Sequence, residues 1–108
     1  GTPFYMSPEQ VQGKPVDGRT DQYSLAIVAY QMFVGERPYK AETLPTLIYK
    51  ILSGQPEVSA TLARNVGEEI GSVLCKALSK DPGARYPTCV EFMNALERAA
   101  IASLTQWT

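Results

Sequence analysis

Residues 20–35 read TDQYSLAIVAYQMFVG and decide the fold. The threonine at the start is a favoured helix N-cap and the glycine at the end is a common C-terminal stop, so the stretch predicts one long helix over about 20–34. Its interior is apolar on nearly every side, which is typical of a buried helix. The β-branched pair Ile27 and Val28 would also suit a buried strand, but the length and the flanking cap favour a helix. We therefore expect a central buried helix around which the other elements pack.

Three further stretches carry apolar residues at the i, i+3, i+4, i+7 spacing of an amphipathic helix. These residues are Leu44, Leu47, Ile48, Ile51 and Leu52, then Ile70, Val73, Leu74, Ala77 and Leu78, then Phe92, Met93, Leu96 and Ala99 or Ala100. Pro45 is compatible with the first of these helices only because it falls in the first turn. Almost no segment is typical of a strand, so the predicted class is all-α.

Cap signals mark where the helices other than the central one begin. A Ser, Thr or Asn followed three residues later by Glu or Gln can form reciprocal hydrogen bonds at a helix start. Such pairs are Ser7 with Gln10, Asn65 with Glu68, and Thr88 with Glu91. The first of them predicts a short helix that begins at Pro8 and ends near Gly13.

Composition excludes several classes of function. The chain has 108 residues, 10 Lys+Arg against 11 Asp+Glu, and no histidine. That length fits one small domain. Without histidine there is no Ser-His-Asp triad, Cys-His dyad, imidazole base or histidine-bound zinc. A net charge of −1 gives no reason to expect nucleic acid as a partner. The adjacent Glu68 and Glu69 suit the positive end of a helix dipole better than a catalytic carboxylate pair.

The two cysteines and the chain start bear on the cellular setting. Cys75 and Cys89 are expected to be small buried residues rather than a disulfide or a nucleophile, and with no secretory signal they favour a cytoplasmic location. The longest apolar run, 25–30, is far shorter than the ~18–20 residues of a membrane span. Because the first residue is Gly1 and not Met, we expect a piece of a longer protein, any membrane anchor of which would lie elsewhere in its chain.

Four strings, taken in order, resemble the Ser/Thr protein kinase family. Residues 1–9, GTPFYMSPE, resemble the P+1 loop and Ala-Pro-Glu motif, and residues 21–26, DQYSLA, resemble the start of the kinase F helix. Residues 35–39, GERPY, are similar to the Gly-x-x-Pro-Phe that follows that helix. Residues 81–86, DPGARY, resemble the Asp-Pro-x-x-Arg segment before the last helix. The order of the four strings and the distances between them also match the family. The residue types Met-Ser-Pro-Glu-Gln and Arg-Tyr favour the bacterial members of the family.

The strings depart from the family pattern at three positions. Ser7 replaces the alanine of Ala-Pro-Glu, Tyr23 replaces the usual tryptophan, and Ala26 replaces the usual glycine. The tyrosine keeps an amphipathic ring. The alanine would alter how closely the catalytic loop approaches the helix.

The resemblance implies which part of a kinase this is. It makes residues 1–108 a partial kinase domain, the helical subdomain of the C-lobe. The Gly-rich loop, the strand lysine, His-Arg-Asp and Asp-Phe-Gly that phosphoryl transfer needs are not in the sequence. The resemblance therefore implies no catalytic, cofactor or metal residue in this chain, which we expect to be inactive by itself. ATP and Mg would belong to the intact parent kinase.

The resemblance also implies structural roles for three residues. Glu9 would form a buried ion pair with Arg85, whereas without the family pattern both would be expected in solvent. Asp21 would accept hydrogen bonds from the backbone of the catalytic loop. On residue chemistry alone, Asp21 is an acid that favours the positive end of the helix dipole, and the two roles are compatible.

Substrate contact would fall to the first residues of the chain. Gly1, Thr2, Pro3 and Tyr5 would belong to the loop that receives the substrate residue after the phospho-acceptor. Thr2 would reach the catalytic aspartate and lysine in an intact kinase, although a chain terminus is also a common place for disorder. The helix over 44–52 corresponds to the G helix, which often docks partners in the family, and plain core packing explains its spacing equally well.

Partners follow from the same resemblance. The parent would bind a protein substrate, and this chain would bind the rest of its kinase domain. Without that covering, residues such as Leu25, Ile27 and Tyr30 of the central helix are expected to be partly bare, which favours self-association or exchange of an element between chains. Two alternatives stay open: a stand-alone helical interaction module, and a pseudokinase remnant. A third reading, a generic helical domain, would require the four ordered matches to have arisen by chance, so we do not favour it.

Overall fold

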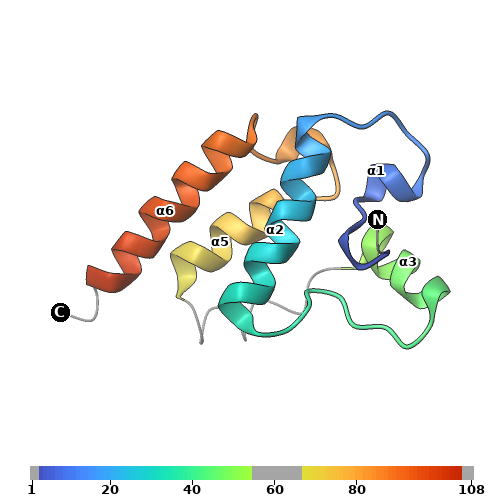
Figure 1. The fold of residues 1–108 in the computed structure, drawn as a ribbon, viewed down its shortest axis with the longest axis horizontal. Coiled ribbons are helices and arrows are strands. Elements are labelled where there is room, and N and C mark those ends of the chain that lie inside the picture. Colours follow the sequence, from blue (N-terminus) through green and yellow to red (C-terminus); the bar gives the residue numbers. More distant parts are fainter. Residues whose placement is uncertain (1–2, 55–66, 106–108) are drawn as a thin grey trace.

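A computed structural model describes residues 3–54 and 67–105, and every regular element in that part of the chain is helical (Figure 1). This confirms the predicted all-α class. The elements are η1 (Pro3–Tyr5), α1 (Pro8–Val11), α2 (Gly18–Val34), α3 (Leu44–Ser53), α5 (Glu68–Ala77), η2 (Pro82–Ala84) and α6 (Cys89–Thr105).

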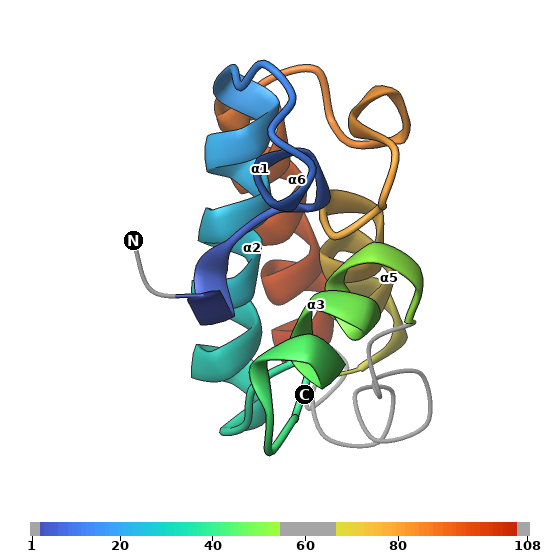
Figure 2. The same ribbon diagram turned by 90° about the vertical axis from the view of Figure 1, so that its right-hand side faces the viewer.

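The long helix α2 separates two groups of elements. On one side α5 and α6 pack against each other and against α2, and on the other η1 packs on α2 while α1 packs on α3 (Figures 1 and 2). The core follows this arrangement. Its buried apolar residues are Tyr23, Ala26, Ile27, Ala29, Tyr30, Tyr39, Leu47, Ile51, Ile70, Leu74, Ala77, Leu78, Phe92, Leu96 and Ala99.

The start of α2 differs from the prediction. The N-cap is Asp17, whose carboxylate accepts the backbone N–H of Arg19 at 2.9 Å. Thr20 lies three residues into the cap box, and its hydroxyl accepts the backbone N–H of Asp17 at 3.4 Å. An aspartate caps at least as well as a threonine, so the helix begins one turn earlier. The predicted stop is confirmed, because Gly35 adopts the left-handed conformation, φ 84°.

The other helix starts agree only in part. Ser7 and Gln10 form the predicted capping box, and Thr88 accepts the backbone N–H of Glu91 at 3.1 Å. Before α5 the prediction was wrong, because the N-cap is Gly67, with φ 90° and no side-chain cap. Its predicted partner, Asn65, lies outside the described residues.

Burial along α2 is uneven, so the expectation of a helix buried all round was wrong. Met32 is 81% exposed and Val28 41% exposed, whereas the polar Gln22 is fully buried. Ile27 and Tyr30, expected to be partly bare, are also buried. The reason is that α5 and α6 pack on one side of α2 and η1 on another, whereas Val28, Met32 and Phe33 remain exposed in the described part of the chain.

Two smaller expectations need correction as well. Cys75 is exposed and Cys89 half-buried, both as free thiols, so they are not the small core residues expected. Met93 lies on α6 but is 44% exposed, because Phe92 and Leu96 face the core instead. None of the described helices is long and apolar enough to cross a membrane.

Candidate functional site

A buried ion pair joins α1 to the loop before α6. The Arg85 guanidinium donates to both carboxylate oxygens of Glu9, Nη1 to Oε2 at 2.7 Å and Nη2 to Oε1 at 2.9 Å. Glu9 is 5% exposed and Arg85 3% exposed. Glu9 is held by the first turn of α1, and Arg85 follows the short helix η2. The structure thus brings together two side chains that lie 76 residues apart in the sequence.

Both charged groups have further partners. The Arg85 side chain donates to the carbonyl oxygens of Ser79 and Arg19, each at 2.9 Å, and the Thr20 hydroxyl donates to Glu9 Oε2 at 2.8 Å. A buried charge is tolerated when its polar atoms are satisfied in this way. Burial pushes the pKa of Glu9 up, but the hydrogen bonds from Arg85, its own backbone and Thr20 outweigh that and hold the pKa at about 2. The carboxylate is therefore ionised at neutral pH.

A second buried polar contact lies next to this pair. The Gln22 side chain donates to the carbonyl of Tyr86 at 2.7 Å and accepts the Tyr86 backbone N–H at 3.0 Å. Gln22 thereby ties α2 to the segment directly after Arg85. Sequence reasoning missed this residue. The available signal was a glutamine directly before the mostly apolar stretch of α2, because such a side chain must find partners when buried.

Side-chain contacts fasten the segment around η1 to α2. The Tyr5 hydroxyl donates to Gln31 at 2.9 Å, and the Ser24 hydroxyl donates to the Tyr5 carbonyl at 2.8 Å. The Arg37 guanidinium stacks on the Phe4 ring, 3.7 Å from its centroid. The turn η1 is therefore fixed through the backbone carbonyl of Tyr5 and through the side chains of Phe4 and Tyr5. Sequence reasoning had singled out Tyr5 but not these anchors.

The remaining predicted site residues are placed as follows. Pro3 begins η1 and is exposed, whereas Gly1 and Thr2 lie outside the described residues. Asp21 is in the first turn of α2 with an exposed side chain. It does not join the Glu9 network.

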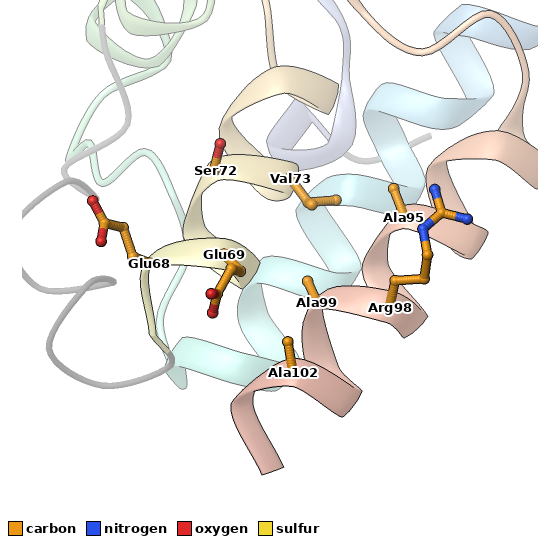
Figure 3. A pocket seen from close by; sticks show the side chains of 8 residues that line it. All are labelled: Glu68, Glu69, Ser72, Val73, Ala95, Arg98, Ala99 and Ala102. Carbon is orange, nitrogen blue, oxygen red and sulfur yellow. The ribbon is translucent and has the colours of Figure 1, made fainter. Parts of the chain in front are cut away.

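Two of the hollows on the described surface lie between helices. A small apolar pocket of about 250 Å³ lies between η1, α1 and α3, lined by residues such as Met6, Leu47 and Ile51. A wider groove of about 490 Å³ lies between α5 and α6. Figure 3 shows two glutamate side chains on its α5 wall, Arg98 on its α6 wall, and alanines between them.

The described residues do not fit a metal site. Within 3–54 and 67–105 there is no group of three or more Asp, Glu, His or Cys side chains that could hold a metal ion. The buried carboxylate of Glu9 already accepts from the Arg85 guanidinium, so it is not free to bind a metal ion.

Comparison with known proteins identifies the family. Residues 1–96 match the model of the protein kinase domain, so the chain belongs to the protein kinase domain family. Its helical architecture and its ordered strings correspond to the C-terminal part of the C-lobe, from the P+1 loop to the last helix.

Curated relatives are bacterial Ser/Thr kinases. The chain is 37% identical over 99 residues to serine/threonine-protein kinase Pkn1 of Myxococcus xanthus, covering 92% of this chain and 14% of that protein. It is 37% identical over 98 residues to serine/threonine-protein kinase PknB of Mycolicibacterium smegmatis, covering 91% and 16%. The chain thus spans about a seventh of the length of these relatives.

A solved structure shows the same fold. The twitchin kinase region from C. elegans superposes with a TM-score of 0.76 at 23% identity, covering 86% of this chain and 17% of that one. The intact kinases of this family use ATP and Mg.

Proposed function

We propose that this chain is the substrate-facing helical part of a Ser/Thr protein kinase that transfers phosphate from ATP to proteins. The single observation that carries the proposal is the buried, bidentate Glu9–Arg85 pair. It ties the end of the Ala-Pro-Glu-like string to the loop before α6 and so sets where the preceding residues lie. In this role the loop formed by Gly1, Thr2, Pro3 and Tyr5 receives the substrate residue after the phospho-acceptor.

The residues of this chain would position the substrate loop and the catalytic loop, and would take no part in the phosphoryl transfer itself. Gln31 and Ser24 hold Tyr5 against α2, which limits how the loop can move when a peptide binds. Asp21 would accept hydrogen bonds from the backbone of the catalytic loop, consistent with its exposed place in the first turn of α2. ATP and Mg would be held by other parts of the kinase. By itself the chain is therefore proposed to be inactive.

A chimera tests the proposal. The stretch of Pkn1 that matches this chain is replaced by the chain, and phosphate transfer from ATP to a generic protein substrate is measured. The expected result is transfer well above background, with Tyr5→Phe raising KM for the peptide more than it lowers kcat. The chain alone, assayed beside the chimera, is expected to show no transfer.

The chimera also separates this function from an interaction module or a pseudokinase remnant. A chimera that folds, as judged by a cooperative thermal transition, but transfers no phosphate contradicts the proposal. An insertion that does not fold in Pkn1 is repeated in PknB of Mycolicibacterium smegmatis, which matches over nearly the same length.

Two further parts of the proposal concern the chain as an isolated molecule. We propose that it self-associates through the strip of α2 that carries Val28, Met32 and Phe33, all exposed. Exposed apolar residues that share one helix commonly mark an interface. Its place is proposed to be the cytoplasm, since its two free thiols suit a reducing compartment.

A further inference from the structure

Arg37 is held beside η1 by the fold around it. Its guanidinium lies over the Phe4 ring, 3.7 Å from the ring centroid. The backbone on both sides of Arg37 is fixed, because Gly35 ends α2 in the left-handed conformation, φ 84°, and Pro38 is fully buried. Tyr5, which follows Phe4, is bonded to α2 through both its hydroxyl and its carbonyl. Both partners of the stack are therefore anchored, so the guanidinium has a defined place next to η1.

The Arg37 side chain also has hydrogen-bond donors to spare. Among the described residues no carboxylate lies within ion-pair distance of it, and its N–H groups form no hydrogen bond. A guanidinium that stacks through its face keeps its N–H donors at its edge, where they can bind two oxygen atoms of one anion side by side. The side chain is exposed, so a peptide can reach these donors.

The neighbouring side chains do not balance the charge of Arg37. The adjacent carboxylate, Glu36, is paired with Lys40 at 2.9 Å. The α2 side chains that hold Tyr5 are a glutamine and a serine, and both are neutral. Arg37 therefore adds a positive charge beside η1 that these neighbours leave available to a bound anion.

We propose that Arg37 is a specificity-determining residue that selects peptide substrates with an oxyanion side chain near the phospho-acceptor. The oxyanion is the carboxylate of Asp or Glu, or the phosphate of a residue that is already phosphorylated. The inference rests on the proposed function, in which the loop of residues 1–5 receives the substrate residue after the phospho-acceptor. Phe4 is part of that loop, so a peptide bound along the loop passes beside the guanidinium.

The contact would have the chemistry that this chain already uses inside its core. Arg85 donates to both carboxylate oxygens of Glu9, and Arg37 would donate in the same way to an acidic side chain of the peptide. The Arg37 contact would be exposed to solvent, so we expect a moderate preference that salt weakens. Phosphate carries more negative charge than carboxylate and should bind at least as well. The same guanidinium would disfavour Lys or Arg at that peptide position.

Phosphate transfer by the Pkn1 chimera to a set of peptides tests the preference. Each position around the acceptor carries Asp, Asn, phosphoserine or Lys in turn, and kcat/KM is measured for every peptide. At the position that meets Arg37, the ratio of kcat/KM for the Asp peptide to that for the Asn peptide is expected to be about two to five. Phosphoserine should give at least that ratio, and a rise in NaCl from about 0.05 M to about 0.5 M should lower it. A ratio near one at every position overturns the inference.

Variants of the chimera assign the preference to the guanidinium. Arg37→Gln should bring the ratio to about one, and Arg37→Glu should reverse it in favour of the Lys peptide. Phe4→Leu, which removes the ring but keeps the charge, should give an intermediate ratio. Lys14→Gln removes an exposed charge elsewhere and should keep the wild-type ratio. Because each ratio compares two peptides on the same enzyme, a general loss of activity does not change it. An unchanged ratio in Arg37→Gln contradicts the inference.

The test also separates this inference from the proposed function. A chimera that transfers phosphate equally well to Asp and Asn peptides contradicts the inference and leaves the proposed function standing. A chimera without transfer contradicts the proposed function, and peptide binding to the 108-residue chain then tests the inference by itself. There the NMR signal of the Arg37 side-chain N–H is expected to shift with Asp or phosphoserine peptides and not with their Asn counterparts. No shift with any acidic peptide overturns the inference.

Discussion

The two ends of α2 show opposite relations between polarity and burial. At the N-terminal end the polar side chains of Thr20 and Gln22 are buried, whereas at the C-terminal end Met32 is 81% exposed. The buried polar residues each have a partner from another segment, Glu9 and Tyr86 respectively. The exposed methionine lies largely in solvent among the described residues. At these positions of α2, burial therefore follows the availability of partners more closely than it follows hydrophobicity.

The difference has an energetic reason. Each polar group at the N-terminal end exchanges water for a specific hydrogen bond, and leaving one partner unpaired there costs more than the bond itself contributes. The apolar side chains of the C-terminal strip need no hydrogen-bond partners, so the strip can be covered by a second surface or stay exposed. The polar end should be intolerant of substitution and the apolar strip tolerant, and the predictions below follow from that contrast.

The largest effect is expected from Arg85→Ala, which strands the buried Glu9 carboxylate. Losing one partner of a buried pair costs about 3–5 kcal/mol of unfolding free energy. Urea denaturation followed by circular dichroism measures it. The control is Lys40→Ala, which removes the exposed Lys40–Glu36 pair and should cost no more than about 1 kcal/mol. Equal losses in the two variants would refute the idea that the buried end is the intolerant one.

The second largest effect is expected from acid, which should lower the free energy of unfolding by protonating Glu9 at the polar end of α2. The folded pKa of Glu9, about 2, lies below its ordinary value of 4.5, so the unfolded chain binds a proton more readily. Stability from this group is fully present above about pH 4.5 and is lost as the pH falls towards 2, by up to about 3 kcal/mol. Urea titrations at several pH values measure it. Glu9→Gln should remove this part of the pH dependence, and a profile as steep as that of wild type in that variant would assign the effect to other carboxylates.

A smaller loss is expected at Gln22. Gln22→Leu leaves the N–H and the carbonyl of Tyr86 without their partner and should cost about 1–3 kcal/mol. Gln22→Glu can make both hydrogen bonds only while its carboxyl is protonated. When ionised it still accepts the N–H, but it cannot donate to the carbonyl and it adds a buried charge, so its loss of stability is expected to grow as the pH rises. The same urea assay applies. A leucine variant as stable as wild type would mean that the apolar environment alone orders this end.

The smallest effect on folding is expected at Met32. Met32→Glu should change the unfolding free energy by no more than about 0.5 kcal/mol, because the side chain is exposed. It should, however, weaken self-association strongly, as measured by light scattering over a range of concentrations. Val16→Glu, an exposed apolar residue outside this strip, serves as the control. A wild-type chain that stays a monodisperse monomer at high concentration would contradict the proposed self-association.

Local patterns were predictable where short-range rules operate. The capping box at Ser7, the stop at Gly35 and the amphipathic spacing of α3, α5 and α6 depend on neighbours a few residues away, and the structure has them. The start of α2 was misplaced because Asp17 and Thr20, three residues apart, are both favoured cap residues, and helix ends are hard to place to within a turn. The apolar composition of α2 was read correctly as a helix but wrongly as burial on all sides.

The site was predictable only through the family resemblance. Glu9 and Arg85 were paired on that basis, and nothing in their local sequence distinguishes them from solvated side chains. Gln22, Gln31 and Lys80 were not singled out at all. Their partners are backbone or side-chain atoms from distant segments, such as the Tyr86 backbone 64 residues away. No periodicity or motif encodes such a contact.

Composition and pattern alone established a helical chain without histidine chemistry, and its ordered strings established a kinase-like C-lobe. Folding in three dimensions decided which polar groups are buried, which apolar residues of α2 stay exposed, and that the Lys80 ammonium donates to the Tyr39 hydroxyl and the Lys50 carbonyl. The physical reason is range. Helix propensity, capping and amphipathic spacing act over a few residues, whereas desolvation and hydrogen bonding of a side chain depend on whatever segment the fold packs against it.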